Sequence, residues 1–99
     1  MTKLGLLAKI EAKPEYADKV EALLHGALQL ALQEEDTVAW FAFRLSATTF
    51  GVFDTFDDEQ GRQKHLEGRI AAALMEAAET MLSEAPEIRP LDVLAAKLP

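Results

Sequence analysis

The sequence predicts an α+β fold of the ferredoxin-like class, with a four-stranded antiparallel sheet and helices on one face. Segments with alternating apolar residues, typical of strands, are separated by segments with apolar residues three and four apart, typical of helices. Their order is strand, helix, strand, strand, helix pair, strand, which is the split arrangement of that class. No linker or repeat interrupts this order, so residues 1–99 are predicted to form one domain.

Each predicted element has its own signal in the sequence. Leu4, Leu6 and Ala8 alternate along the first strand, as expected when one strand face is buried. Asp57 or Asp58 can cap the helix that follows the third strand. The predicted strands are residues 4–12, 37–45, 49–56 and 91–96, and the predicted helices run from residue 14 to about 34, from 57 to 66 and from 69 to 83.

The second predicted strand carries apolar side chains on both faces. Phe41 and Phe43 alternate with Trp40 and Ala42, whereas an antiparallel strand in a small monomer normally turns one face to water. The helices of this chain can cover only one side of the sheet. We therefore expect a second copy to pack against the other side, sheet to sheet, as a homodimer that forms a dimeric α+β barrel.

Composition and charge exclude several classes of function. The net charge of −7 repels a nucleic-acid backbone, and the ten Lys and Arg residues are scattered along the chain. The absence of cysteine excludes disulfides and thiolate chemistry. The apolar run at the start is interrupted at Lys9, too early for an export signal or a membrane span. We expect a cytoplasmic protein with no nucleic-acid partner and no membrane partner.

His65 is the residue that we expect to accept a proton. An imidazole titrates near neutral pH, and the helix that carries His65 borders the space between helices and sheet. The alternative is a histidine that only hydrogen-bonds a neighbouring loop. Asp54 either orients His65, as a carboxylate fixes an imidazole, or pairs with Arg44 across the hairpin, which the sequence favours. His25 is expected on the outside of the first helix, and two distant histidines do not predict a metal site.

Four aromatic residues are candidates for contact with a small apolar or aromatic ligand. Ligand pockets are lined mostly by apolar side chains, and an indole can stack on an aromatic ring. The same side chains also suit a core or a subunit interface. The four candidates are Trp40, Phe41, Phe43 and Phe53.

Two segments resemble the antibiotic biosynthesis monooxygenase superfamily of dimeric α+β barrel proteins. Phe53-Asp54-Thr55-Phe56, followed by a polar helix with His65-Leu66, is similar to the superfamily's strand end and histidine-leucine pair. Residues 6–24 are similar to its first strand and helix. The resemblance implies a small cofactor-independent monooxygenase, in which the anion of a quinol or polycyclic aromatic substrate reduces dioxygen without flavin or metal, with His65 assisting the deprotonation.

The departures from the superfamily narrow this expectation. The haem-degrading branch uses an asparagine and an iron-binding histidine. This sequence contains no asparagine. If His65 stands where that branch has a tryptophan, the iron-binding histidine would fall near Met75, where there is none, so haem degradation is not expected. The superfamily also contains members without demonstrated chemistry. The alternative function is therefore a non-catalytic dimeric binding or interaction module of the same fold.

Overall fold

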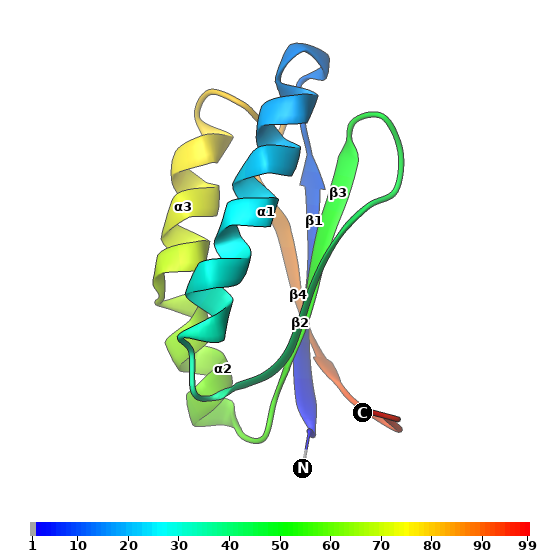
Figure 1. Cartoon of the computed structure of the whole chain (residues 1–99), viewed down its shortest axis with the longest axis vertical. Coiled ribbons are helices and arrows are strands. Elements are labelled where there is room, and N and C mark those ends of the chain that lie inside the picture. The colour runs from blue at the N-terminus through cyan, green and yellow to red at the C-terminus, as the bar shows by residue number, and fades with distance from the viewer. Residues whose placement is uncertain (1) are drawn as a thin grey trace.

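The computed structural model describes residues 2–99. Figure 1 shows one sheet with all three α-helices on the same side, which confirms the predicted ferredoxin-like α+β fold. No helix in residues 2–99 has both the length and the apolar composition that a membrane span requires. The elements are β1 (Leu4–Glu11), the 3₁₀ helix η1 (Pro14–Tyr16), α1 (Ala17–Leu32), β2 (Thr37–Arg44), β3 (Thr49–Phe56), α2 (Glu59–Leu66), α3 (Arg69–Ala78) and β4 (Glu87–Asp92).

The core lies between the helices and one face of the antiparallel sheet, whose strand order is β2-β3-β1-β4. Ile10 from β1, Val20 from α1, and Phe50 and Phe56 from β3 are at most 1% exposed. Burying a side chain of this size contributes roughly 1.5–3 kcal/mol. The alternation in β1 and β3 therefore determines which sheet face meets the helices, since a slip of one residue would expose these side chains.

The last strand differs from the prediction. It spans Glu87–Asp92 and not residues 91–96, so Pro90 lies inside the strand. The predicted strand began only after Pro90, which has no N–H to donate to a neighbouring strand. β4 pairs only with β1 and forms an edge of the sheet, where a residue without an N–H is tolerated. The predicted bounds were wrong for this reason.

The helix α3 is shorter than predicted. It ends at Ala78, whereas the apolar pattern predicted a helix to residue 83. Leu82 instead forms an isolated β-bridge with Ala12, the residue that follows β1, and both residues are buried. Met81 also packs against the core. Met81 and Leu82 therefore reach the core, as the apolar spacing predicts, but they lie in the turn after α3 and not in the helix.

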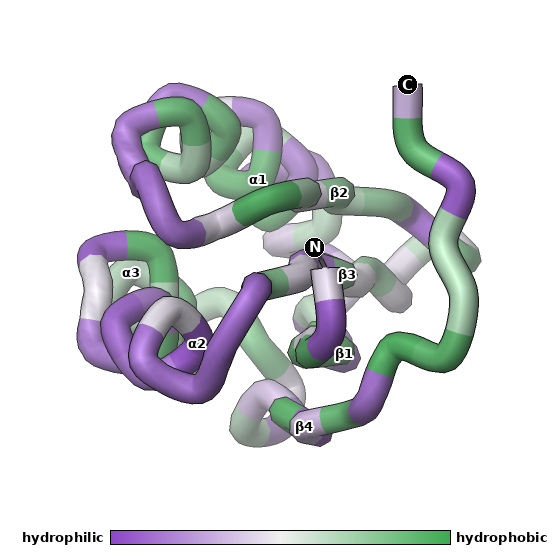
Figure 2. The backbone as a smooth tube through the Cα atoms, turned by 90° about the horizontal axis from the view of Figure 1, so that it is seen from below, coloured by the Kyte–Doolittle hydropathy of each residue, from purple (hydrophilic) through white to green (hydrophobic). Residues whose placement is uncertain are grey.

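The sheet face away from the helices is apolar at its centre, and its residues Leu7, Phe41, Phe43 and Phe53 are referred to below as the open face. Leu7, Phe53 and Phe41 lie side by side across three strands. The Phe43 ring covers Gly51, where an added Cβ would meet the ring at 2.3 Å. Leu7 is 38% and Phe41 is 55% exposed. Figure 2 shows the segment after β4 on this side of the sheet, opposite the helices.

Candidate functional site

Three polar side chains from different parts of the chain meet near the C-terminal ends of α1 and α2. His65 in α2 lies between Asp54 in β3 and Glu34, which follows α1. The His65 Nε2 atom is 2.8 Å from Asp54 Oδ2, and its Nδ1 atom is 2.7 Å from Glu34 Oε1. His65 is 8% exposed and Asp54 is 1% exposed. These three residues are referred to below as the His65 cluster.

The local sequence places two members of the cluster. Asp54 has the same strand parity as Phe56, so both side chains point toward the helices and are buried. The helix α2 begins soon after β3, where the Asp58 side chain accepts a hydrogen bond from the Gly61 N–H at 2.9 Å. Later in the same helix, His65 turns inward, with its ring centre 5.3 Å from that of Phe56.

Glu34 is the member that sequence reasoning missed. It lies where the sequence predicts only that the first helix ends, in the acidic run Glu34-Glu35-Asp36. Thr37 Oγ1 donates to Glu34 Oε1 at 2.8 Å. The other carboxylate oxygen of Glu34, Oε2, lies near Gly68 at the N-terminal end of α3, where a helix favours negative charge. No local pattern signals the contact with His65, because the two residues are 31 positions apart.

Both ring nitrogens of His65 face carboxylate oxygens. An ionised carboxylate only accepts hydrogen bonds, so this arrangement favours the imidazolium form, in which both ring nitrogens donate. Burial lowers the pKa of His65, but the hydrogen bonds and charges of Asp54 and Glu34 together outweigh burial and raise that pKa above its ordinary value. Neither nitrogen is open to a substrate in this arrangement. A catalytic role for His65 stays a prediction, and this geometry favours an indirect one.

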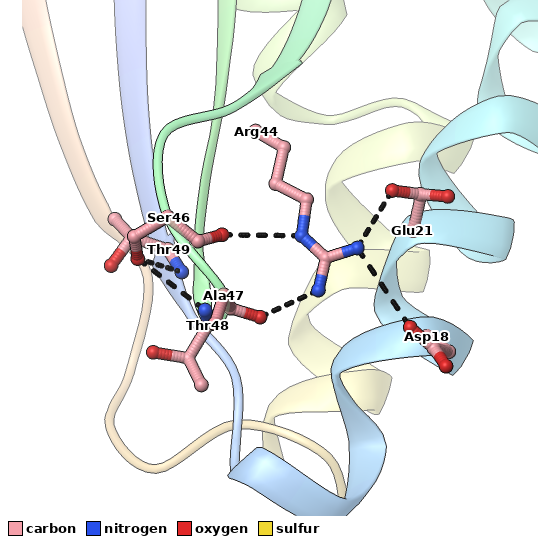
Figure 3. Close-up of polar contacts among 7 residues, drawn as sticks. All are labelled: Asp18, Glu21, Arg44, Ser46, Ala47, Thr48 and Thr49. Atoms are coloured by element: carbon pink, nitrogen blue, oxygen red, sulfur yellow. Dashed lines mark hydrogen bonds and ion pairs between the residues drawn. The ribbon is translucent and has the colours of Figure 1, made fainter.

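The expected pair between Asp54 and Arg44 is wrong. The register of the β2–β3 hairpin puts Asp54 opposite Trp40, with Arg44 further along the strand. Arg44 instead binds Glu21 on α1 at 2.9 Å, as Figure 3 shows. A sequence does not reveal hairpin register when both strands are apolar on two faces. The other interpretation, in which Asp54 orients His65, is the one that agrees with the structure.

A small cavity lies beside the His65 cluster, between the sheet and the helices α2 and α3. Its volume is about 30 Å³, and Asp54 and His65 are its polar lining residues. Asp54 Oδ1 is buried and has no hydrogen-bond partner within residues 2–99. A volume of roughly 30 Å³ is one water molecule's share of liquid water, so the cavity has room for a molecule of that size. The apolar lining includes Leu6, Val52, Ile70, Leu74 and Ile88.

A larger hollow lies on the other side of the cluster. Its volume is about 300 Å³, and its lining includes Glu34 and His65 together with the basic residues Lys64 and Arg69. The Glu34 side chain is 22% exposed, so solvent reaches the cluster at Glu34 but not at Asp54. In the part of the chain that the structure describes, no three His, Asp or Glu side chains are placed to hold a metal ion.

The structure does not bring the four predicted ligand-contacting aromatics together with His65. Trp40 packs toward the helices, whereas Phe41, Phe43 and Phe53 belong to the open face. Neither hollow beside His65, as formed by residues 2–99, is lined by any of the four. Trp40, Phe41 and Phe43 line a separate pocket between α1 and β2, which does not include Phe53. Contact between these aromatics and a ligand stays a prediction.

Comparison with protein-family models and with curated proteins found no match. Among solved structures, the NE2512 protein of unknown function from Nitrosomonas europaea is 54% identical, with a TM-score of 0.97 over 100% of this chain and 96% of that one. PA3566 from Pseudomonas aeruginosa is 22% identical, with a TM-score of 0.80 over 96% and 97% of the two chains. A structure described as an antibiotic biosynthesis monooxygenase is 18% identical, with a TM-score of 0.80 over 93% and 99%.

Proposed function

This chain belongs to the family of the NE2512 protein and has the fold of the antibiotic biosynthesis monooxygenase superfamily, and on that basis we propose that it is a small cofactor-independent monooxygenase. Its substrate is an electron-rich quinol or polycyclic aromatic, and dioxygen is the oxidant. The observation that carries the proposal is the buried carboxylate of Asp54, which has one oxygen without a partner among residues 2–99 and lines a mostly apolar cavity.

The reaction begins when Asp54 Oδ1 takes a proton from a hydroxyl group or an acidic C–H group of the substrate. The anion gives an electron to dioxygen, and the resulting radicals combine into a carbon-bound peroxide anion, which takes the proton back from Asp54 and still has a hydrogen on the same carbon. Loss of water then leaves a carbonyl group. One oxygen atom ends in the product and the other in water, and the substrate carbon supplies all of the electrons. The reaction therefore needs no external reductant.

His65 and Glu34 support Asp54 in this proposal. The His65 Nε2 atom holds Asp54 Oδ2 at 2.8 Å, so the imidazolium compensates the buried negative charge and leaves Oδ1 for the substrate. Glu34 holds the other ring nitrogen at 2.7 Å and fixes the orientation of the imidazole. His65 therefore assists deprotonation as a positioning residue, and Asp54 is the catalytic residue.

The apolar lining of the cavity extends to β4, at the edge of the sheet. Ile88 lies on the helix-facing side of β4 and is 37% exposed, while Ile70 and Leu74 of α3 form part of the cavity wall. An aromatic ring is larger than the present space of about 30 Å³, so it enters by displacing these side chains. The ring then excludes water, which protects the anion from being protonated again before it meets dioxygen.

The proposed active form is a homodimer joined through the open face. Phe41 is 55% exposed and Leu7 is 38% exposed, and burying each large apolar side chain contributes roughly 1.5–3 kcal/mol. A two-fold axis brings the same patch of both copies together. The helices and the cavity lie on the opposite side of the sheet and stay accessible. We place this dimer in the cytoplasm, an assignment that the absence of cysteine supports.

Oxygen uptake with a panel of naphthoquinols and anthrones tests the proposal. Asp54→Asn keeps the shape of the side chain but removes the basic oxygen, and should lower the rate by at least about tenfold, within the range of general-base effects. His65→Ala should also lower it at least about tenfold, because Asp54 loses its partner. Asp92→Asn, at an exposed aspartate of β4, is the matched control and should leave the rate unchanged. Uptake that Asp54→Asn does not alter would contradict the proposed role.

The alternative function is a non-catalytic dimeric binding module of the same fold. One observation favours it: the His65 cluster is fully hydrogen-bonded at the imidazole, and the adjoining cavity has a volume of only about 30 Å³. Such a cluster also serves to fasten β3, α1 and α2 together. If no compound in the panel consumes oxygen, but one binds saturably, the module explains the protein better.

A further inference from the structure

We propose that the pocket between α1 and β2 is a second ligand site, which takes a neutral planar aromatic molecule with a hydroxyl group. Its volume is about 450 Å³, within the range of roughly 300–1,000 Å³ that is typical of small-molecule sites. Leu24, Leu28, Trp40 and Phe50 form much of its apolar wall. It shares no lining residue with the two hollows beside the His65 cluster. The site is therefore separate from the proposed active site.

Trp40 gives this pocket an unused hydrogen-bond donor. Trp40 lines the pocket, and its Nε1 atom has no hydrogen-bond partner anywhere in residues 2–99. The atom is covered in this structure, so a ligand reaches it only when a side chain of the pocket wall moves aside. A buried N–H without a partner is unfavourable, so an acceptor that reaches it is bound with a gain in free energy. The oxygen atom of an aromatic hydroxyl group is such an acceptor. The indole ring also offers a flat surface for a ligand ring.

The charges around the pocket favour a neutral ligand, as Figure 3 illustrates. Arg44 Nη1 lies 2.9 Å from Glu21 and 3.7 Å from Asp18. The other guanidinium nitrogens donate to the backbone carbonyls of Ser46 and Ala47. Each nitrogen of the Arg44 guanidinium thus has a partner, and its charge is more than balanced by two carboxylates. An anionic ligand would find no unpaired cation here and would be repelled by Asp18 and Glu21.

His25 is the polar group that is left to recognise a hydroxyl group. It lies on the exposed side of α1 and lines the pocket. Within residues 2–99 it has no hydrogen-bond or ion-pair partner. A neutral imidazole has one donor and one acceptor nitrogen, so it can accept the hydroxyl proton of the ligand. Trp40 and His25 therefore offer a donor and an acceptor to the same hydroxyl-bearing aromatic.

The indole resonance of Trp40 reports directly on this pocket, because the chain contains a single tryptophan. We would titrate the full-length protein with 1-naphthol and follow the Trp40 indole N–H peak by ¹H–¹⁵N NMR. Ala42→Phe fills the pocket from an exposed strand position, and Ala22→Phe adds the same group at an exposed α1 position outside it. The peak should shift saturably in the unaltered protein and in Ala22→Phe, and binding should weaken at least about tenfold in Ala42→Phe.

Two further titrations identify the ligand class. His25→Ala, which removes the acceptor, should weaken 1-naphthol binding about threefold or more, but should leave the binding of 1-methoxynaphthalene, which has no hydroxyl proton, unchanged. The 1-naphthoate anion should bind more weakly than 1-naphthol. The proposal is overturned if the indole peak shows no saturable shift at millimolar 1-naphthol, if Ala42→Phe binds as tightly as Ala22→Phe, or if naphthoate binds at least as well as naphthol.

Discussion

Replacing His65 by glutamine tests the His65 cluster through the stability of the fold. His65 is 8% exposed and contacts both Asp54 and Glu34. A glutamine has a similar size, but it carries no positive charge and cannot donate in two opposite directions at once. The substitution therefore leaves the negative charge of Asp54, which is 1% exposed, without its partner. The packing around position 65 changes little, so the loss reports mainly on the charges.

The expected loss is large. Removing one partner of a buried ion pair typically lowers the free energy of unfolding by roughly 3–5 kcal/mol, because the remaining charge stays buried. Asp54 already has one buried oxygen without a partner within residues 2–99, so it has no other group to turn to. We expect a loss of about 4 kcal/mol near pH 6, against a total of about 5–15 kcal/mol for a typical domain.

The loss should depend on pH in a defined direction. The pKa of His65 is raised in the folded protein, so its ion pairs contribute fully below the unfolded value of about 6.5. That contribution disappears as the pH rises through the raised folded pKa. The stability difference between the unaltered protein and His65→Gln should therefore be greatest near pH 6 and should narrow on the alkaline side.

Urea denaturation at a fixed protein concentration, followed by Trp40 fluorescence between about pH 6 and pH 9, measures this difference. His25→Gln is the matched control, since His25 is exposed, and should change the stability by less than about 0.5 kcal/mol. A loss below about 1 kcal/mol for His65→Gln near pH 6 would refute the reasoning, since it would place the cluster among exposed ion pairs. A difference that widens with rising pH would refute the assigned charge state.

Two other predictions concern the open face and a helix cap. Phe41→Glu should separate the proposed homodimer into monomers in analytical ultracentrifugation, whereas Leu32→Glu, at a residue of α1 that is 70% exposed, should not; dimers that survive Phe41→Glu would place the interface elsewhere. Asp58→Ala should lower the free energy of unfolding by about 1 kcal/mol, because the Gly61 N–H loses its acceptor, and Asp58→Ser should restore most of it. Equal stability of the two Asp58 variants would show that the cap contributes nothing measurable.

Much of the fold could be predicted from apolar spacing. The alternation of Leu6, Ala8 and Ile10 indicated β1 correctly, because burial on one face forces that pattern. The end of α3 and the bounds of β4 were predicted wrongly for one shared reason: the effect of a residue on local structure depends on its tertiary context. Pro90 breaks a central strand but is tolerated in an edge strand, and Leu82 continues a helical spacing from a turn.

Less of the candidate site could be predicted. His65 and Asp54 were identified as candidates, but the sequence favoured Arg44, and not His65, as the partner of Asp54. The role of Glu34 was missed, since an acidic run after a helix is more simply explained by solvent exposure. Which partner Asp54 takes depends on the hairpin register, and that is set by turn geometry and packing across three elements. Spacing along one strand contains no information about either contact.

Direct observation of the His65 ring by ¹⁵N NMR tests the central claim, that a buried imidazolium is held between two carboxylates. The account predicts that both ring nitrogens carry protons at pH 6 and that the ring titrates above about 6.5, the value of an unperturbed histidine. The raised titration should fall back in Glu34→Gln. A ring that titrates below about 6.5 would contradict the charge state on which both the stability prediction and the proposed role of Asp54 depend.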